Sequence, residues 1–157
     1  MKYFLWPLLL LLVLTGCTTD SELELRSPDQ KNLFLLEVDD ELVYEVDHRS
    51  DNIIERSVIG YAFKNAPFLG KDMEVVSVQK KEVDSNWNPV LKRYTQIRNH
   101  YSEMVVQLKE RNFPGRRMKV EVRAYNDGIA FRSWFQVRDT AFQYTITDEK
   151  VGFNFKD

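Results

Sequence analysis

The sequence predicts an all-β fold of antiparallel strands, and two features carry that prediction. Along the 157 residues, apolar side chains recur at every second position far more often than at spacings of three and four, as in half-buried strands. Clusters of Gly, Pro, Asn and Asp separate these short segments at intervals typical of a β-sandwich or β-barrel. The length suits one domain.

The expected strands follow one another from residue 23 to residue 155. They are Leu23–Arg26, Leu33–Val38, Leu42–Asp47, Ile53–Arg56, Gly60–Lys64, Met73–Val83, Tyr94–Lys109, Met118–Tyr125, Ile129–Gln136, Phe142–Thr147 and Val151–Phe155. The turns between them are expected at Ser27-Pro28-Asp29, Asp39-Asp40, Asp51-Asn52, Asn65-Ala66-Pro67, Asn86-Trp87-Asn88-Pro89, Phe113-Pro114-Gly115 and Asn126-Asp127-Gly128.

Residues 1–16 have the pattern of a bacterial lipoprotein signal peptide. One cation, Lys2, precedes an apolar run from Phe4 to Leu14, and the small residue Gly16 comes directly before Cys17, the single cysteine of the chain. A transmembrane anchor is one alternative, but an apolar run of about 11 residues is too short for a bilayer that needs about 20. An ordinary secretory signal with a chance cysteine is the other.

We therefore expect a signal peptide at 1–16, and a lipidated Cys17 with its tether at 17–26. Several acyl chains on one residue anchor a protein stably to a membrane. The expected location is the cell envelope, periplasmic or associated with the outer membrane.

The composition excludes several classes of function. The formal net charge is −2, from 22 basic and 24 acidic residues, so no basic stripe is available for phosphates and no nucleic-acid partner is expected. One cysteine and two histidines exclude a disulfide framework and a zinc site built from several thiolates or imidazoles. No P-loop, dinucleotide fingerprint or nucleophile elbow is present.

The alternation around the Asn126-Asp127-Gly128 turn predicts a hairpin. A two-residue turn at Asp127-Gly128 would pair Arg123 with Arg132 and gather the apolar residues on one face. A three-residue loop would instead pair Val122 with Arg132 and mix the faces, so the patterning favours the shorter turn.

The second face of this hairpin has an unusual composition. It would carry Arg123 opposite Arg132, two like charges that repel each other unless a carboxylate intervenes. Glu121, Tyr125 and Trp134 flank them. We expect another layer to cover this face.

The alternation changes phase between Ile97 and Met104, which predicts a β-bulge near residues 100–102. Such a bulge can re-aim side chains near a functional site, but the simpler explanation is that it bends a long strand around the edge of the sandwich. His100 lies there beside Asn99, so it is the better histidine candidate for a function, although a structural hydrogen bond is the main alternative. His48 is expected to be a polar strand end.

Other candidates are few. Trp87, in a loop bounded by proline, could stack on a sugar ring or pack the loop onto the sheet. The carboxylates are scattered, and no spacing selects an acid and base pair for glycoside hydrolysis. We therefore assign no catalytic residue.

Four motifs together resemble one known family. In chain order they are Pro67-Phe68-Leu69-Gly70, Trp87-Asn88-Pro89-Val90, Arg98-Asn99-His100-Tyr101-Ser102-Glu103 and Arg123-Ala124-Tyr125-Asn126-Asp127-Gly128-Ile129-Ala130-Phe131-Arg132. Their order and spacing resemble the N-terminal domain of glycoside hydrolase family 97, the α-glucosidase and α-galactosidase family of Bacteroidetes polysaccharide-utilisation systems.

The resemblance implies an antiparallel β-super-sandwich, galactose mutarotase-like, spanning 27–157 and incomplete at the C-terminus. In full-length members a catalytic (β/α)8 barrel and a small C-terminal sandwich follow. The family hydrolyses α-glycosidic bonds with barrel carboxylates and a calcium ion, and has inverting and retaining members. The catalytic acid and base have no matching positions here, and the calcium-binding glutamate of this domain is expected beyond Asp157. We therefore assign no metal ligand and no cofactor to this chain.

The resemblance implies a non-catalytic, carbohydrate-binding or supporting domain of a lipid-anchored α-glycosidase, inactive alone. The expected partners are the membrane through Cys17, an α-linked oligosaccharide, and the catalytic barrel. Two alternatives are a free-standing surface lipoprotein that binds carbohydrate and, less well supported, an epimerase like the mutarotases. The candidates for carbohydrate binding or interdomain contact are Trp87, Arg98, Asn99, His100, Arg123 and Arg132.

Overall fold

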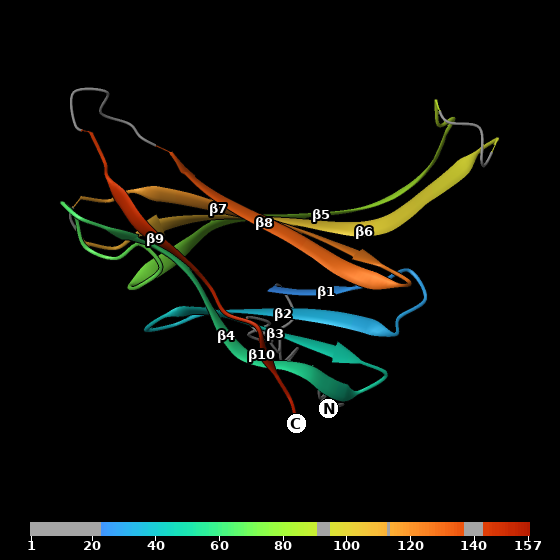
Figure 1. The fold of residues 1–157 in the computed structure, drawn as a ribbon, viewed down its shortest axis with the longest axis horizontal. Helices are drawn as coiled ribbons and strands as arrows, with labels where there is room; N and C mark the ends of the chain where they lie inside the picture. The colour runs from blue at the N-terminus through green and yellow to red at the C-terminus, as the bar shows by residue number, and fades with distance from the viewer. Residues whose placement is uncertain (1–22, 91–94, 113, 137–142) are drawn as a thin grey trace, which may run out of the picture.

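The computed structural model describes residues 23–90, 95–112, 114–136 and 143–157. Its strands form two layers, and every pairing between strands is antiparallel, which confirms the predicted fold class (Figure 1). The strands are β1 (Glu24–Arg26), β2 (Asn32–Val38), β3 (Leu42–His48), β4 (Asp51–Phe63), β5 (Met73–Trp87), β6 (Ile97–Glu110), β7 (Arg117–Tyr125), β8 (Gly128–Gln136), β9 (Ile146–Val151) and β10 (Asn154–Phe155).

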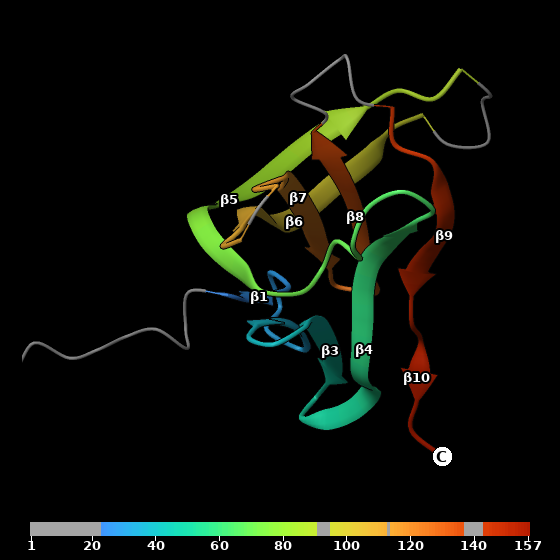
Figure 2. The same ribbon diagram turned by 90° about the vertical axis from the view of Figure 1, so that its left-hand side faces the viewer.

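One sheet has the strand order β1-β2-β3-β4-β10, with β9 also paired to β4, and the other has the order β5-β6-β7-β8. Figure 2 shows β9 and β10 following one another along β4 at an edge of the first sheet. Among the described residues, no helix is long and apolar enough to cross a membrane. Cys17 and the predicted signal peptide lie outside the described residues.

The last two predicted strands and the start of a third need correction. The chain pairs with β4 over Ile146–Val151 and Asn154–Phe155, later than the predicted Phe142–Thr147 and Val151–Phe155. The predicted strand from Tyr94 begins at Ile97 as β6, and Tyr94 and Phe142 themselves lie outside the described residues. Short apolar runs near loops fix a strand's existence better than its ends.

The predicted strands 53–56 and 60–64 are one strand, β4, and the reason lies at Gly60. A Cβ at this position would lie 2.3 Å from Cζ of Phe68 and 2.4 Å from the carbonyl oxygen of Leu69. The backbones of Tyr61 and Leu69 exchange hydrogen bonds of 2.8 and 2.9 Å beside it. Gly60 therefore permits a close approach of the following loop and does not mark a turn.

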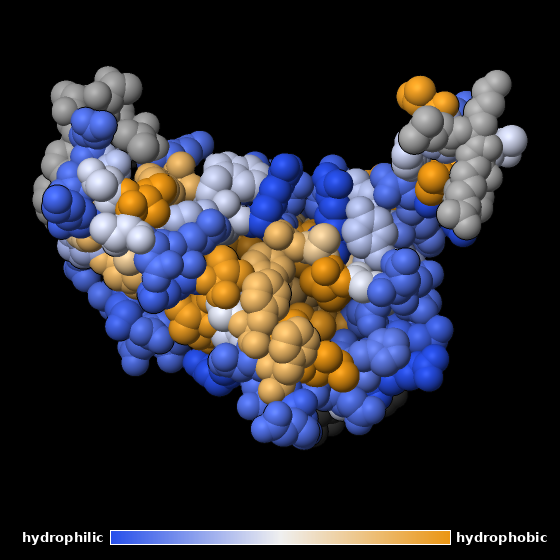
Figure 3. Space-filling model, in the orientation of Figure 1, coloured by the Kyte–Doolittle hydropathy of each residue, from blue (hydrophilic) through white to orange (hydrophobic). Residues whose placement is uncertain are grey.

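The core lies between the inner faces of the two sheets. Phe34 and Tyr44 stack with ring centroids 5.4 Å apart, and Phe131 of the other sheet lies 4.7 Å from Tyr44. Other fully buried side chains are Leu36, Leu42, Ile59, Leu69, Met73, Met104, Val106, Leu108, Met118 and Val120. Each large side chain stabilises the fold by roughly 1.5–3 kcal/mol on burial. Apolar atoms also reach the surface between the layers (Figure 3). Phe153, whose ring lies 6.3 Å from Tyr44 and 6.2 Å from Phe131, is 54% exposed.

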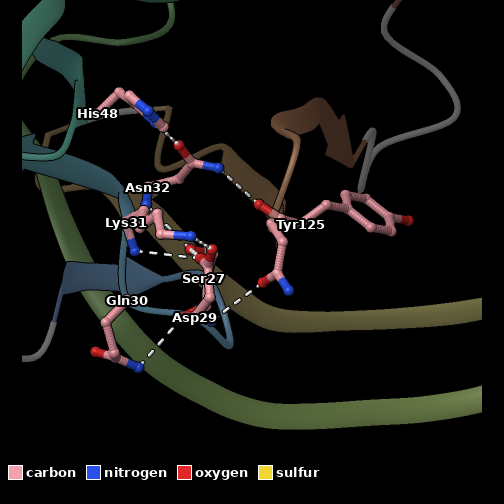
Figure 4. Close-up of polar contacts among 8 residues, drawn as sticks. Ser27, Asp29, Gln30, Lys31, Asn32, His48 and Tyr125 are labelled. Carbon is pink, nitrogen blue, oxygen red and sulfur yellow. Dashed lines mark hydrogen bonds and ion pairs between the residues drawn. The ribbon is translucent and has the colours of Figure 1, made fainter.

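A buried polar network, here called the Asn32 clamp, joins the two sheets at one end (Figure 4). Asn32 Nδ2 donates to the carbonyl oxygen of Tyr125 over 2.8 Å, and its backbone N–H donates to Ser27 Oγ over 3.0 Å. Its Oδ1 lies 2.6 Å from Nδ1 of His48, which must be the donor because an amide oxygen only accepts. His48 is thus the polar strand end that the sequence predicts.

A second network, the Arg116 clamp, joins the sheets at the other end of β7. The Arg116 guanidinium donates to both oxygens of Glu110, over 2.9 and 2.5 Å, and to the carbonyl oxygen of Pro67 over 2.9 Å. It also lies 5.0 Å above the ring of Phe63. Both charged side chains are more than nine-tenths buried, so each depends on the other for compensation.

Replacement of Asn32 by Ala should destabilise the fold by about 1–3 kcal/mol, because it leaves the Tyr125 carbonyl and the His48 ring without partners. Urea denaturation would measure the loss. Asn126→Ala is the matched control, because the Asn126 side chain only accepts an exposed hydrogen bond from the backbone N–H of Asp29. Equal losses in the two variants would contradict a special role for Asn32.

Glu110→Ala should cost about 3–5 kcal/mol, because the buried Arg116 charge loses its counter-ion. The control is Glu41→Gln, which breaks an exposed pair with Lys71 and should cost less than about 1 kcal/mol. Chemical denaturation of both variants measures the difference, and a loss below 1 kcal/mol for Glu110→Ala would count against the clamp.

Candidate functional site

The outer face of the β5–β8 sheet carries an ion-pair ladder that crosses all four strands. Lys81 on β5 lies 2.7 Å from Glu103 on β6, which also accepts a 2.9 Å hydrogen bond from Arg123 on β7. Glu121 of β7 accepts from Arg123 over 3.3 Å and from Arg132 of β8 over 2.9 Å. Cations and carboxylates therefore alternate across the sheet, with the carboxylates buried and Arg132 exposed.

The predicted pairing of Arg123 with Arg132 is wrong, whereas the predicted faces are correct. Arg123 lies opposite Ala130, and Arg132 lies opposite Glu121, because Asn126-Asp127 forms the turn instead of Asp127-Gly128. The change of register moves the pairing by an even number of positions, so no side chain changes face. It places the carboxylate of Glu121 between the two arginines, which the predicted register left facing each other.

Glu103 shows how the ladder changes the chemistry of its members. Burial acts to raise the pKa of Glu103, but hydrogen bonds from Lys81 and Arg123 outweigh burial and hold the pKa below its usual value. Burial likewise acts to lower the pKa of Arg123, and its hydrogen bond to Glu103 reverses that effect. Glu103 therefore keeps its negative charge to a lower pH than an unpaired glutamate would.

Aromatic rings lie beside the ladder. Tyr101 and Tyr125 are neighbours with centroids 5.1 Å apart, and the Arg123 guanidinium lies 4.8 Å above the Tyr101 ring. Trp134 contacts two cations, with Lys119 Nζ at 3.8 Å and the Arg132 guanidinium at 4.9 Å from a ring centroid. These contacts are cation–π interactions.

The β-bulge predicted near residues 100–102 is absent from β6, whose described residues pair regularly with β7 from Tyr101 to Lys109. The register shift lies instead in β5, between Val75 and Ser77. The strand has no real change of phase between Ile97 and Met104. Tyr101 is a buried aromatic residue on the outer face, so it suggested an inward-facing position that it does not have. An amphipathic tyrosine under an arginine looks apolar in a sequence pattern.

Strands β5 and β6 continue past the end of β7, whose last partner on β6 is Tyr101. We call residues 84–87 and 97–100 the arm, which curves away from the core in Figure 1. Trp87 ends β5 opposite Ile97 and is 53% exposed, so it lies in a strand and not in the predicted loop. Asp84 and Asn86 are poor strand formers, so cross-strand contacts such as the Arg98–Asp84 ion pair favour the pairing here.

One ion pair and one hydrogen bond link β5 and β6 at the arm. Arg98 donates to both oxygens of Asp84 over 2.8 and 2.6 Å, and His100 Nε2 lies 2.6 Å from Glu82. Alternation places Arg98 and His100 on the side of the arm that continues the core face, whereas Asn99 shares the outer face. The structure therefore gathers Trp87, Asn99, Arg123 and Arg132 on one face and leaves Arg98 and His100 on the other.

Two hollows mark the outer face. One of about 190 Å³ is lined by Glu121, Arg123, Tyr125, Ala130, Phe131 and Arg132. Another of about 130 Å³ is lined in part by Arg117, Lys119 and Trp134. Sequence reasoning named Trp134 only as a flanking residue and did not select Lys119 or Glu103 as candidates. The contacts of Lys119 with Trp134 and of Glu103 with Arg123 depend on the registers between β6, β7 and β8.

The described residues give no support for a metal site. They contain no group of three or more His, Cys, Asp or Glu side chains placed to hold an ion. An acidic hollow on the other sheet is lined by Glu45, Asp47 and Glu55, but Arg56 and Lys156 also line it. Its Asn52 amide donates to Asp47 over 2.9 Å, so this site does not fit a calcium ion.

Comparison with known proteins shows which family this chain resembles in sequence and fold. The family described as "Glycosyl-hydrolase 97 N-terminal" matches residues 25–157. A retaining α-galactosidase of Bacteroides thetaiotaomicron is 28% identical over 132 residues, which cover 84% of this chain and 19% of that protein.

Solved structures give the same result for the fold. A glycoside hydrolase family 97 enzyme from Pseudoalteromonas sp. strain K8, solved with panose, superimposes with a TM-score of 0.79 at 18% identity, over 85% of this chain and 20% of that one. A β-arabinopyranosidase has a TM-score of 0.72 at 18% identity, over 85% and 21% of the two chains. The chain thus spans about one fifth of the length of these relatives.

Replacement of Glu103 by Gln should lower stability at neutral pH by about 1.5–3 kcal/mol, the usual worth of hydrogen bonds to a charged group. The pKa of Glu103 is lower in the folded than in the unfolded state, so its contribution is present above the unfolded pKa of about 4.3 and is lost as the pH falls through the folded pKa. Thermal melting between about pH 7 and pH 3 should therefore show a shallower decline for Glu103→Gln than for the wild type. Asp39→Asn, at an exposed turn, is the control, and parallel declines for wild type and Glu103→Gln would contradict this account.

Proposed function

The chain belongs to the glycosyl hydrolase 97 N-terminal domain family, and on that premise we propose that it is the non-catalytic, supporting and carbohydrate-binding domain of a lipid-anchored α-glycosidase. The relatives support a supporting role, since about four fifths of their length lies outside the region that this chain matches. Hydrolysis of α-glycosidic bonds would belong to that remaining part.

The observation that carries the proposal is the ladder of buried carboxylates, cations and aromatic rings on the outer face of the β5–β8 sheet. Glu103 and Glu121 are buried under cations, and aromatic rings lie beside them, yet no described residue forms a second layer above. The outer cations of the ladder, Lys81 and Arg132, are largely exposed, and exposed ion pairs contribute little to the stability of a surface that stays in water. The ladder is better suited to a surface that another domain covers.

Carbohydrate binding has its own support on this face. Trp134 and the half-exposed Trp87 offer apolar rings that can stack on the C–H face of a sugar, and Arg132 and Tyr125 offer polar groups for hydroxyls. We propose an α-linked oligosaccharide as the ligand. The names of the relatives include an α-galactosidase and an enzyme solved with panose, which favours such a ligand.

The lipid anchor is proposed from Cys17 and the leader before it, with a location in the cell envelope. Calcium is proposed only for the complete enzyme, and no step is assigned to it here.

A free-standing surface lipoprotein that binds carbohydrate is the second candidate function, and the exposed ring of Trp87 favours it.

The purified chain should not hydrolyse aryl α-glucosides or aryl α-galactosides, and tryptophan fluorescence should report weak binding of panose. Trp134→Ala should weaken that binding about threefold to tenfold, by loss of stacking worth about 0.5–1.5 kcal/mol. The matched control is Tyr144→Phe, away from the outer face of β5–β8. Hydrolysis that disappears when one of the chain's own carboxylates is replaced would overturn the non-catalytic role. Absence of panose binding would contradict the proposed carbohydrate-binding role.

A further inference from the structure

The outer face of the β5–β8 sheet is more positive than the chain as a whole. The strand registers place six cationic side chains and three carboxylates on it. The cations are Lys81, Lys109, Arg117, Lys119, Arg123 and Arg132, and the carboxylates are Glu74, Glu103 and Glu121. Because the whole chain has a net charge of −2, the cations are concentrated here and the acids elsewhere.

The three carboxylates do not compensate every cation. Glu103 and Glu121 are occupied by the ladder, and Glu74 lies 3.6 Å from Lys109. Among the described residues, Lys119 and Arg117 have no carboxylate partner. Arg132 uses one nitrogen for Glu121, and its side chain is 66% exposed.

Arg117, Lys119 and the partly compensated Arg132 form what we call the cation cluster, beside Trp134. The indole ring attracts Lys119 and Arg132 but carries no net charge, so it orients them without neutralising them. Nε of Arg117 is buried and has no hydrogen-bond partner, which is costly unless a partner arrives. The adjacent 130 Å³ hollow provides the space for one.

We propose that this face docks onto a polypeptide surface that presents carboxylates, and that the cation cluster receives them. The inference rests on the proposed function, since the relatives carry about four fifths of their length beyond the matched region. Charge complementarity selects the chemistry: guanidinium and ammonium groups bind carboxylates through charge-assisted hydrogen bonds, whereas a neutral oligosaccharide offers no counter-ion.

The shape of the face also favours a folded partner. Strands β5 and β6 curve away from the core at the arm, so the outer face is concave beside it (Figure 1). The cations are spread over β5, β6, β7 and β8 rather than gathered in one pocket. A broad concave face with distributed charge matches a protein surface better than a single small anion.

The test uses the full chain with Trp6→Phe and Trp87→Phe, which leaves Trp134 as the only tryptophan and a reporter inside the cation cluster. The probes are a peptide of alternating Glu and Ser, and the same peptide with Gln in place of each Glu. The Glu peptide should change Trp134 fluorescence saturably, and its affinity should fall about tenfold or more between about 20 and 300 mM salt. The Gln peptide should produce no change.

Substitutions in the cation cluster test whether the Glu peptide binds there. Lys119→Gln with Arg132→Gln should weaken binding of the Glu peptide at least about tenfold, whereas Lys156→Gln, an exposed lysine on the other sheet, should change it less than about twofold. Circular dichroism confirms that each variant is folded. Equal binding of the two peptides, no binding of either, or an unchanged affinity in the double variant would overturn the inference.

Titration of the wild-type chain, which keeps Trp87, with panose and with the Glu peptide separates this inference from the proposed function. A response to panose without a response to the Glu peptide would retain the carbohydrate-binding function and overturn the acidic partner. A response to the Glu peptide without panose would support the docking face and remove the saccharide from it.

Discussion

Strand β7 is fixed at both ends by buried polar contacts, with the loop between β4 and β5 at its start and with β2 at its end, and the position of the outer face depends on them. At its start the Arg116 guanidinium reaches Pro67, and at its end the Tyr125 carbonyl accepts a hydrogen bond from Asn32. The apolar core between these points is non-directional and would tolerate sliding of one sheet over the other. The two clamps set the relative position of the sheets, because hydrogen bonds of fixed geometry do not tolerate such movement.

That constraint explains how a charged ladder is maintained on the far side of the same strand. Inner residues of β7 such as Val120 and Val122 are fully buried, so their outward neighbours Glu121 and Arg123 have fixed positions. The carboxylates then meet cations from three other strand positions without losing much further conformational entropy. Electrostatics on the outer face is thus a consequence of packing on the inner one.

The sequence alone could predict the faces but not the registers. Alternation correctly separated Val120, Val122 and Ala124 from the charged residues between them, since a period of two is a local property. It could not decide which two residues close the β7–β8 turn, because both choices keep the same faces. Nor could it recognise that Tyr101 lies on the outer face, since a tyrosine under an arginine has an apolar body. The candidate residues were therefore found one by one, whereas their grouping needed the three-dimensional pairing.

The carboxylate of Glu121 has a consequence for how this face can change in evolution. It is shared by Arg123 and Arg132, so loss of either arginine changes the environment of the other. Contacts of this type are coupled, and their substitution effects do not add. A homologue that loses one of the three residues would come under selection to replace the others. We expect the trio to vary together among relatives, as one inherited unit.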